Sequence, residues 1–341
     1  MEAVIVEIAN AATGLDRAPS FPTAALAALG RAGALAGGLP LADQLRLVRA
    51  VARADGSVGR ILDGHLNAVE RLRLLAADDP AVAGDLDEIS AGRLWLGLWG
   101  ADPVDGEGDP ARLTGEPGDW RLTGTKVFCS GAGGVHRAAV IARGPDAPAE
   151  RWLAYVDLTA RVDVDRTWFR GSGMRASESH RVEFDHARVL AVLGQPGELA
   201  REPWFSRDAI RTAASWAGMV DTALDAALAS LAHRPRVGDL EGLAVGRMLT
   251  SNKTIDLWLA AAAAAQDDPS ALTELSVHLR DAVSTAAAAI LDEAARVCGS
   301  RPFALGDPLD RARRDLELLL LQHRLDPLVA RRGLRALEVD R

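Results

Sequence analysis

The stretch Trp120-Arg-Leu-Thr-Gly-Thr-Lys-Val-Phe-Cys-Ser-Gly-Ala132 decides the fold that this sequence predicts. It reads as a strand, a turn at Thr123-Gly124 and a second strand. The second strand ends in small residues, where a backbone can approach a flat ligand closely. Many hairpins share this texture, so the residues alone predict a β-hairpin and leave its function open.

The sequence on either side of this hairpin divides into a helical part, a β-rich part and a second helical part. Apolar residues recur at helical spacing from Leu41 to Ala52 and from Val58 to Leu75. Between about Ser90 and Leu199, short alternating runs such as residues 152–158 are separated by Gly, Pro and Asp clusters, which predicts strands and turns. After Pro203, Ala/Leu-rich segments with short breaks predict an antiparallel bundle, with helices over residues 205–232, 239–266, 269–297, 308–322 and 325–338.

We therefore expect an α+β fold, mainly α, in three domains. Residues 1–89 form an N-terminal helical domain, residues 90–200 a small β-barrel or sandwich, and residues 201–341 a C-terminal antiparallel helical bundle. The length agrees with several domains, because 341 residues exceed the size at which one hydrophobic core usually stops growing. Hydrophobic residues make up 48% of the chain and aromatic residues only 4%, and the excess of Ala and Leu favours helices.

Composition argues against several classes of function. A formal net charge of −8 opposes a broad phosphate-neutralising surface, so we expect no nucleic-acid partner. Two cysteines, Cys129 and Cys298, fit neither a disulfide framework nor a zinc site, so we expect free thiols in the cytoplasm. The most apolar run, residues 257–265, is too short to span a bilayer, and residues 1–20 lack the features of a signal peptide, so we expect no membrane partner. No metal is expected, and the histidines without ligand spacing are expected at the surface or in turns: His136, His180, His186, His233 and His278.

Two segments closely resemble signatures of the acyl-CoA dehydrogenase superfamily of flavoproteins, which includes reduced-flavin monooxygenases of the same fold. One is the stretch 120–132, and the other is Gly173-Met-Arg-Ala-Ser-Glu-Ser-His-Arg-Val-Glu-Phe-Asp-His-Ala-Arg-Val189. The resemblance implies that Phe128 lies against the flavin isoalloxazine and that Ser130 offers its hydroxyl or amide near flavin N5. It also implies FAD as the cofactor, with FMN as the alternative, at the junction of the β-domain and the bundle.

The loop before the hairpin carries a weaker resemblance. Leu98-Trp-Gly-Ala-Asp-Pro103 is similar to the flavin-contacting loop of the family, with Ala101 in place of the usual Thr. The resemblance makes Leu98 and Ala101 candidates for backbone hydrogen bonds to the flavin pyrimidine edge. An ordinary acidic surface loop is the alternative interpretation.

The bundle supplies candidates for the rest of the cofactor. Family members commonly oligomerise through this domain, which implies a homodimer or homotetramer in which an Arg and a Gly-rich loop meet the pyrophosphate or adenosine across a subunit boundary. Arg234 or Arg236 and Gly299 are the candidates in this sequence. A solvated helix end after Ala232 is the alternative interpretation.

The catalytic base of a dehydrogenase is not at its family position. That base is normally Glu, but the usual position falls on His323 and the alternative position on Ile210. Histidine accepts a proton near neutral pH. Reduced-flavin monooxygenases of this fold place a His near the first position, and some carry another in a segment that residues 54–68 resemble. By analogy His65, Ser130 and His323 form a monooxygenase site, with two histidines to move protons and a Ser to stabilise the oxygenated flavin. The alternatives are a helix-capping role for His323 and a buried structural role for His65.

The leading hypothesis is a flavin-dependent oxidoreductase that dehydrogenates an acyl thioester, an acyl-CoA or a carrier-bound acyl group, with hydride transfer to flavin. The first alternative is a reduced-flavin-dependent monooxygenase that acts on a small substrate through the three residues just named. The second alternative is a degenerate paralogue without catalysis, which keeps the fold as a binding or structural partner.

Overall fold

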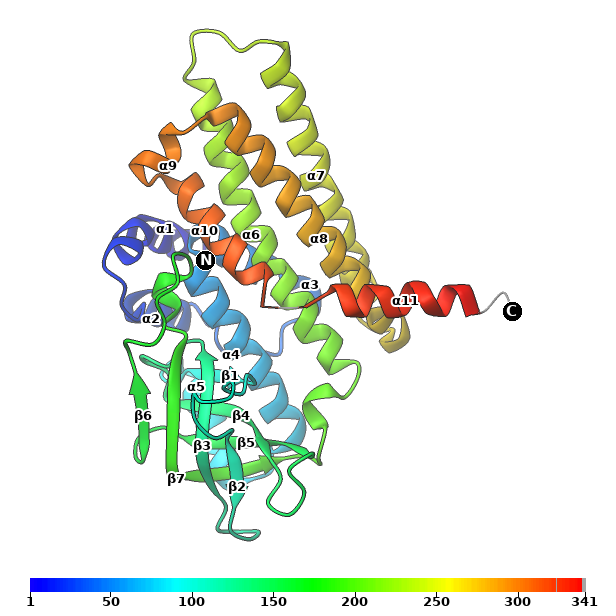
Figure 1. The fold of residues 1–341 in the computed structure, drawn as a ribbon. Helices are drawn as coiled ribbons and strands as arrows, with labels where there is room; N and C mark the ends of the chain where they lie inside the picture. Colours follow the sequence, from blue (N-terminus) through cyan, green and yellow to red (C-terminus); the bar gives the residue numbers. More distant parts are fainter. Residues whose placement is uncertain (323, 339–341) are drawn as a thin grey trace. The chain divides into compact units, whose positions relative to one another are not determined.

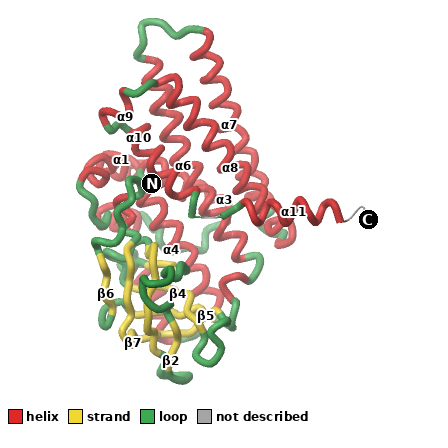
Figure 2. Tube along the Cα trace, in the orientation of Figure 1, coloured by secondary structure: helices red, strands yellow, loops and turns green. Residues whose placement is uncertain are grey.

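The computed structural model describes residues 1–322 and 324–338, and these residues form two compact units (Figure 1). The first unit consists of Met1–Gly38, Arg60–Arg170 and Arg175–Phe205. The second consists of Leu39–Gly59, Gly171–Met174 and the described part of Ser206–Arg341. In Figure 2 the yellow strands all belong to the first unit. The division into three domains stays a prediction.

The first unit combines short helices with one sheet. Its helices are α1 (Glu2–Arg17), α2 (Thr23–Arg31), α5 (Pro80–Ser90) and, from Arg60 onward, α4 (Gly56–Leu75). Its strands are β1 (Leu96–Trp99), β2 (Arg112–Thr114), β3 (Arg121–Cys129), β4 (Arg137–Arg143), β5 (Arg151–Asp157), β6 (Val162–Asp165) and β7 (His180–Leu193). Two short 3-10 turns, η1 (Arg175–Ser177) and η2 (Glu198–Ala200), complete it.

The sheet closes into a small barrel. Strand β3 pairs antiparallel with β2 and β7, β7 pairs with β5, β5 with β4, and β4 with β2. Strand β1 adds to β4 in parallel, and β6 adds to β7 antiparallel. The prediction of a mainly helical α+β fold with a small β-barrel in its middle is therefore confirmed.

The turn predicted at Thr123-Gly124 is wrong, because β3 runs through it without a break. The register with β7 shifts at this point and Gly124 takes a φ of +114°, so the strand bulges instead of turning. A Cβ on Gly124 would lie 2.8 Å from the carbonyl oxygen of Pro110. The neighbouring segment crosses here closely enough for the Thr125 N–H to donate to the Asp109 carbonyl at 2.7 Å. A glycine at this position allows that crossing.

Helices α4 and α5 share a hydrophobic core with the barrel. Burial of apolar surface contributes about 25 cal/mol per Å², so a shared core of this kind holds helices on a sheet. The hydroxyl of Tyr155 donates to Asp85 Oδ2 at 2.7 Å, which satisfies the polar atom that enters this core. The buried members are Ala68, Val69, Leu72, Val82, Ile89, Leu94, Leu96, Ala139, Leu153, Tyr155 and Leu193.

The second unit is a bundle of long helices. Its α8 begins after Asp268, whose carboxylate accepts from the backbone N–H groups of Ser270 and Ala271, and Pro269 occupies the first turn. The predicted bundle helices begin and end within two residues of those observed. The helices are α3 (Leu41–Ala54), α6 (Trp204–Ala232), α7 (Asp239–Ala264), α8 (Pro269–Cys298), α9 (Arg301–Leu305), α10 (Pro308–Leu320) and α11 (Asp326–Glu338).

Half-buried Arg49 is one of the residues that join helix α3 to the other helices of this bundle. Arg49 donates two parallel hydrogen bonds to the carboxylate of Asp221 on α6, at 2.7 and 2.8 Å, and a third to Asp256 on α7 at 2.7 Å. Such a bidentate fork fixes geometry as well as charge. A Cβ on Gly218 of α6 would lie 2.2 Å from the Arg49 carbonyl oxygen, so α3 and α6 meet backbone to backbone.

Among the described residues, no helix combines the length and the apolar character that crossing a bilayer requires. Within the same residues, no three His, Cys, Asp or Glu side chains gather as a set of metal ligands. Cys129 and Cys298 are both unpaired and buried.

Candidate active site

The aromatic ring of Phe128 stands out from the end of β3. It is 52% exposed, and its φ of +53° is a left-handed conformation that costs a bulky side chain on the order of 1–3 kcal/mol. The register between β3 and β7 shifts here, which takes this ring out of the regular alternation of the sheet. Trp168 meets the Phe128 ring edge-on, with 4.8 Å between ring centroids. Strained backbone thus presents an aromatic pair at the surface.

Three serine hydroxyls form a chain that begins two residues after Phe128. Ser130 Oγ lies 3.0 Å from Ser179 Oγ, which lies 2.8 Å from Ser177 Oγ. Ser177 and Ser179 are buried and Ser130 is half-buried, so Ser130 is the outer end. Each hydroxyl donates one proton and accepts others, so the inner two can donate outward and leave the Ser130 proton for a ligand.

The backbone around Ser130 is fixed from both sides. Trp99 Nε1 donates to the Ser130 carbonyl at 3.0 Å, and the Gly131 N–H donates to the Ser177 carbonyl at 2.7 Å. The indole of Trp99 lies directly over Gly97, where a Cβ would come within 2.5 Å of Nε1. The outer hydroxyl therefore sits on a rigid support.

The loop that follows β1 is anchored by buried Lys126. Its Nζ donates to the Gly100 carbonyl at 3.0 Å and to Asp102 Oδ1 at 2.7 Å. Burial lowers the pKa of Lys126, while the hydrogen bond and charge of Asp102 act in the opposite direction. The Val127 N–H donates to the Ala101 carbonyl at 3.2 Å. The loop is thus held against β3, and the contact of Leu98 and Ala101 with a flavin stays a prediction.

His180 is a buried histidine that the sequence analysis missed. It was expected at the surface or in a turn, but it opens β7 opposite Cys129 and is only 5% exposed. Its Nε2 lies 3.7 Å from Glu178, which pairs with Arg166 at 3.2 Å. Among the described residues neither ring nitrogen has a hydrogen-bond partner. The inward alternation of residues 180, 182 and 184 was the available signal.

His65 is held in the interior by two backbone groups. The Leu96 N–H donates to Nδ1 at 3.0 Å, so Nε2 carries the proton and donates to the Leu35 carbonyl at 2.8 Å. The ring is 1% exposed, and burial lowers the pKa of His65 to about 4 although the bond to Leu35 opposes this. Both nitrogens are occupied, which favours the structural interpretation over a proton shuttle.

The cofactor candidates of the bundle gather at one end of the second unit. Arg234 donates to the Val297 carbonyl and lies 3.5 Å from Glu241. Gly299 caps α8 with a φ of +72°, and the space on its Cβ side is open. Arg236 is exposed in the loop between α6 and α7. The roles of these residues toward a cofactor stay predictions.

The family positions of the catalytic base fall on His323 and Ile210. His323 lies outside the described residues. Ile210 is fully buried in α6, so the alternative family position holds an apolar side chain.

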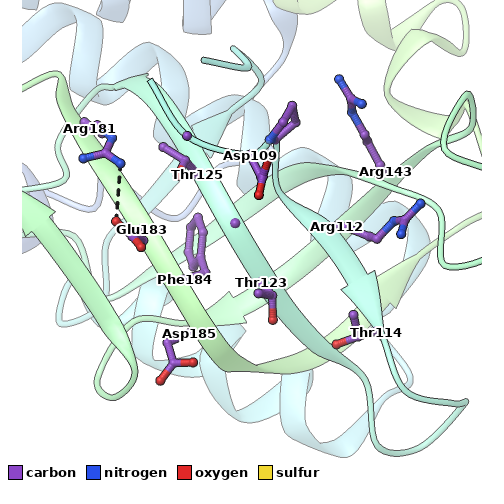
Figure 3. A pocket seen from close by; sticks show the side chains of 13 residues that line it. Asp109, Arg112, Thr114, Thr123, Thr125, Arg143, Arg181, Glu183, Phe184 and Asp185 are labelled. Carbon is purple, nitrogen blue, oxygen red and sulfur yellow. Dashed lines mark hydrogen bonds and ion pairs between the residues drawn. The ribbon is translucent and has the colours of Figure 1, made fainter. Parts of the chain in front are cut away.

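A polar hollow of about 680 Å³ opens on the wall of the barrel (Figure 3). Arg181 and Glu183 stand on one side of Phe184, and Arg112 and Arg143 on the other. Its charges balance, because the acidic residues Asp109, Glu183 and Asp185 face the basic residues Arg112, Arg143 and Arg181.

Solved structures of known enzymes superpose on nearly the whole chain. FMN-bound TdsC, a dibenzothiophene monooxygenase from Paenibacillus sp. A11-2, gives a TM-score of 0.85 at 20% identity over 96% of this chain and 94% of that one. The chain has the acyl-CoA dehydrogenase-like fold. KijD3, in complex with FMN and dTDP-3-amino-2,3,6-trideoxy-4-keto-3-methyl-D-glucose, gives a TM-score of 0.82 at 22% identity over 93% and 86%. The resemblance to the acyl-CoA dehydrogenase superfamily is thereby confirmed at the level of the fold.

One relative with a similar sequence matches part of the chain. The dibenzothiophene monooxygenase of Rhodococcus erythropolis is 28% identical over 160 residues, which are 45% of this chain and 38% of that enzyme. No family model matches the chain.

Proposed function

We propose that this protein is a flavin-dependent monooxygenase that uses reduced FMN and acts on a small organic substrate. A monooxygenase is similar in sequence to part of the chain, and FMN is bound in solved structures that share its fold. Both comparisons support the monooxygenase alternative better than dehydrogenation of an acyl thioester, and the FMN-bound solved structures support FMN better than FAD. The observation that carries the proposal is the exposed ring of Phe128 on left-handed backbone beside the Ser130 hydroxyl chain.

The end of β3 fits a flat ring system. A strained backbone conformation persists where the surrounding structure holds it, and such positions gather at functional sites. Here the strain exposes an aromatic surface, with Trp168 bracing the Phe128 ring at its edge. An isoalloxazine lying on that surface would bring its edge to the small residues that follow, Ser130 and Gly131.

Bound reduced flavin would supply the electrons that activate oxygen. A chain in which Ser177 donates to Ser179, and Ser179 to Ser130, would leave the Ser130 proton at Oγ toward the ring edge. Trp99 and Gly131 would keep that hydroxyl in place through their bonds to the Ser130 and Ser177 carbonyls. A donor fixed before the reaction stabilises developing charge without reorganisation. His323 remains the proposed proton carrier, whereas His65 supports the fold.

Acyl-thioester dehydrogenation has less support in the described residues. It needs a base at the thioester α-carbon, and at one of the two family positions the chain offers only buried Ile210. The other family position, His323, lies outside the described residues, so the reaction of bound flavin with an acyl-CoA must distinguish dehydrogenation from monooxygenation.

FMN binding is measured first, from the quenching of flavin fluorescence. A separate flavin reductase with NADH then supplies reduced FMN in air, and indole serves as the probe substrate because it is bound in a TdsC structure. The proposal expects saturable FMN binding and an oxygenated indole product that requires the protein. Absence of FMN binding would favour the non-catalytic paralogue. Bleaching of bound flavin by an acyl-CoA without oxygen would favour the dehydrogenase.

A further inference from the structure

A second hollow of the barrel, of about 720 Å³, is lined mainly by basic side chains. Three guanidinium groups face it together with a single carboxylate, although the whole chain carries a net charge of −8. The hollow on the barrel wall, in contrast, balances its charges. The lining residues are Arg121, Asp157, Thr159, Ala160, Arg161, His186 and Arg188.

The single carboxylate, Asp157, is already engaged. It accepts from Arg137 at 3.1 Å and from the backbone N–H and the hydroxyl of Thr159 at 2.9 and 2.7 Å. Burial raises the pKa of Asp157, but these Thr159 bonds and the charges of Arg137 and Arg188 outweigh it, and the net pKa is lowered. Arg137 does not line the hollow, so Asp157 pairs with an arginine that lies outside the lining.

The three arginines of the hollow are weakly held. Arg188 has no acidic oxygen within 4.0 Å in the described part of the chain. Arg161 pairs with Asp185 at 3.1 Å, but both side chains are more than half exposed, and such pairs contribute little. Arg121 pairs at 2.6 Å with Asp119, whose side chain is 77% exposed. All three guanidinium groups can therefore turn to an incoming anion.

The backbone beneath the hollow is strained at two adjoining points. Arg161 has a φ of +59° and His186 a φ of +53°, in the left-handed region that residues other than glycine adopt uncommonly, although His adopts it more often than Arg. The two points are joined, because the Asp185 N–H donates to the Arg161 carbonyl at 3.0 Å. The His186 N–H donates to Thr123 Oγ1 at 3.3 Å. Strain held in this way gathers at ligand sites.

We propose that this basic hollow, formed by Arg121, Arg161, His186 and Arg188, binds a phosphate-bearing small molecule at a site separate from Phe128. Guanidinium forks match phosphate oxygens in pairs, and an open hollow of this volume admits a small ligand. The acidic chain as a whole argues against nucleic acid as the source of the phosphate.

The test is calorimetric titration with inorganic pyrophosphate in a phosphate-free buffer of low ionic strength. Arg188→Ala removes no ion pair, so the variant should fold, which an unchanged thermal unfolding temperature would verify. We expect one pyrophosphate per chain and at least about tenfold weaker binding in Arg188→Ala, which corresponds to about 1.4 kcal/mol. Arg112→Ala is the matched control: it also lacks an ion pair among the described residues but lines the balanced hollow, and its affinity should stay within about twofold.

Two results would overturn the proposal: no heat of binding at millimolar pyrophosphate, or equal loss of affinity in Arg112→Ala and Arg188→Ala. A titration with ADP then identifies the source of the phosphate, since tighter binding of ADP that still depends on Arg188 indicates a nucleotide. The FMN affinity of Arg188→Ala tests whether the basic hollow is separate from the flavin site. It should equal that of the wild type, and its loss would assign the hollow to the flavin site instead.

Discussion

Ser179 has no expected contact with a ligand, but its Oγ lies 3.0 Å from Ser130 Oγ, and a hydrogen bond donated across this distance would direct the Ser130 proton outward. Replacing Ser179 with Ala removes the inner donor, and we expect FMN affinity to stay within about threefold while indole oxygenation falls at least about tenfold. Ser179→Thr keeps the hydroxyl and should restore most of the activity. Oxygenation measured with FMN affinity in the three proteins tests this. Equal loss in both variants would indicate a packing defect instead.

His65 ties two backbone groups together, and its neutral form is the one that fits. Its folded pKa of about 4 lies below the ordinary value of 6.5, so the unfolded chain binds more protons between these values. Protonation of the unfolded chain therefore lowers the free energy of unfolding by up to about 3 kcal/mol as the pH falls from 6.5 to 4, and this loss is absent above pH 6.5. We expect His65→Phe to be less stable at pH 7 and to show a flatter loss of unfolding free energy between pH 7 and 4.5. Exposed His278→Phe should follow the wild type, and an unchanged slope in His65→Phe would refute this role.

The sequence predicted some residues of the candidate site and missed others for physical reasons. Phe128 and Ser130 belong to a local motif, so the family resemblance of the stretch 120–132 singled them out. The roles of Ser179 and His180 depend on partners about fifty residues away at the end of β3. No local sequence pattern contains such partners. The occupied nitrogens of His65 likewise depend on Leu35 and Leu96, so the resemblance of residues 54–68 left both a catalytic and a structural interpretation open.

The bulge of β3 at Gly124 lets the segment 109–111 cross the strand closely. Gly124→Ala would force a side chain into φ +114° and bring a Cβ within 2.9 Å of the Asp109 carbonyl and 2.8 Å of that of Pro110. We expect a loss of about 2–4 kcal/mol in the free energy of unfolding. Gly118→Ala also has a positive φ but meets nothing within 4 Å, so denaturant unfolding of the two variants separates strain from collision. Equal losses would show that the crossing of residues 109–111 is not what requires the glycine.

At the scale of elements, periodicity predicted the helices well and the hairpin poorly. Helix boundaries follow caps and breaks that lie within the segment, such as Asp268-Pro269 before α8. A Thr-Gly pair permits either a turn or a bulge. Here the bulge forms where residues 109–111 pack against the strand.

For the whole molecule, the order of helical, β-rich and helical segments was enough to predict the fold, but not how segments group into compact units. Residues 39–59 belong with the bundle, because Arg49 pairs with Asp221, 172 residues further along the chain. No composition or spacing reveals a pair of that separation. Function at this scale rests on whether the end of β3 holds a flavin.

The most direct measurement of that point is the dissociation constant of FMN for Phe128→Asn, determined by fluorescence quenching beside the wild type. Asn tolerates the left-handed conformation, so we expect the free energy of unfolding to stay within about 1 kcal/mol. Loss of the aromatic surface should weaken FMN binding at least about tenfold. Wild-type FMN affinity in a folded Phe128→Asn protein would contradict the proposal that this ring carries the flavin.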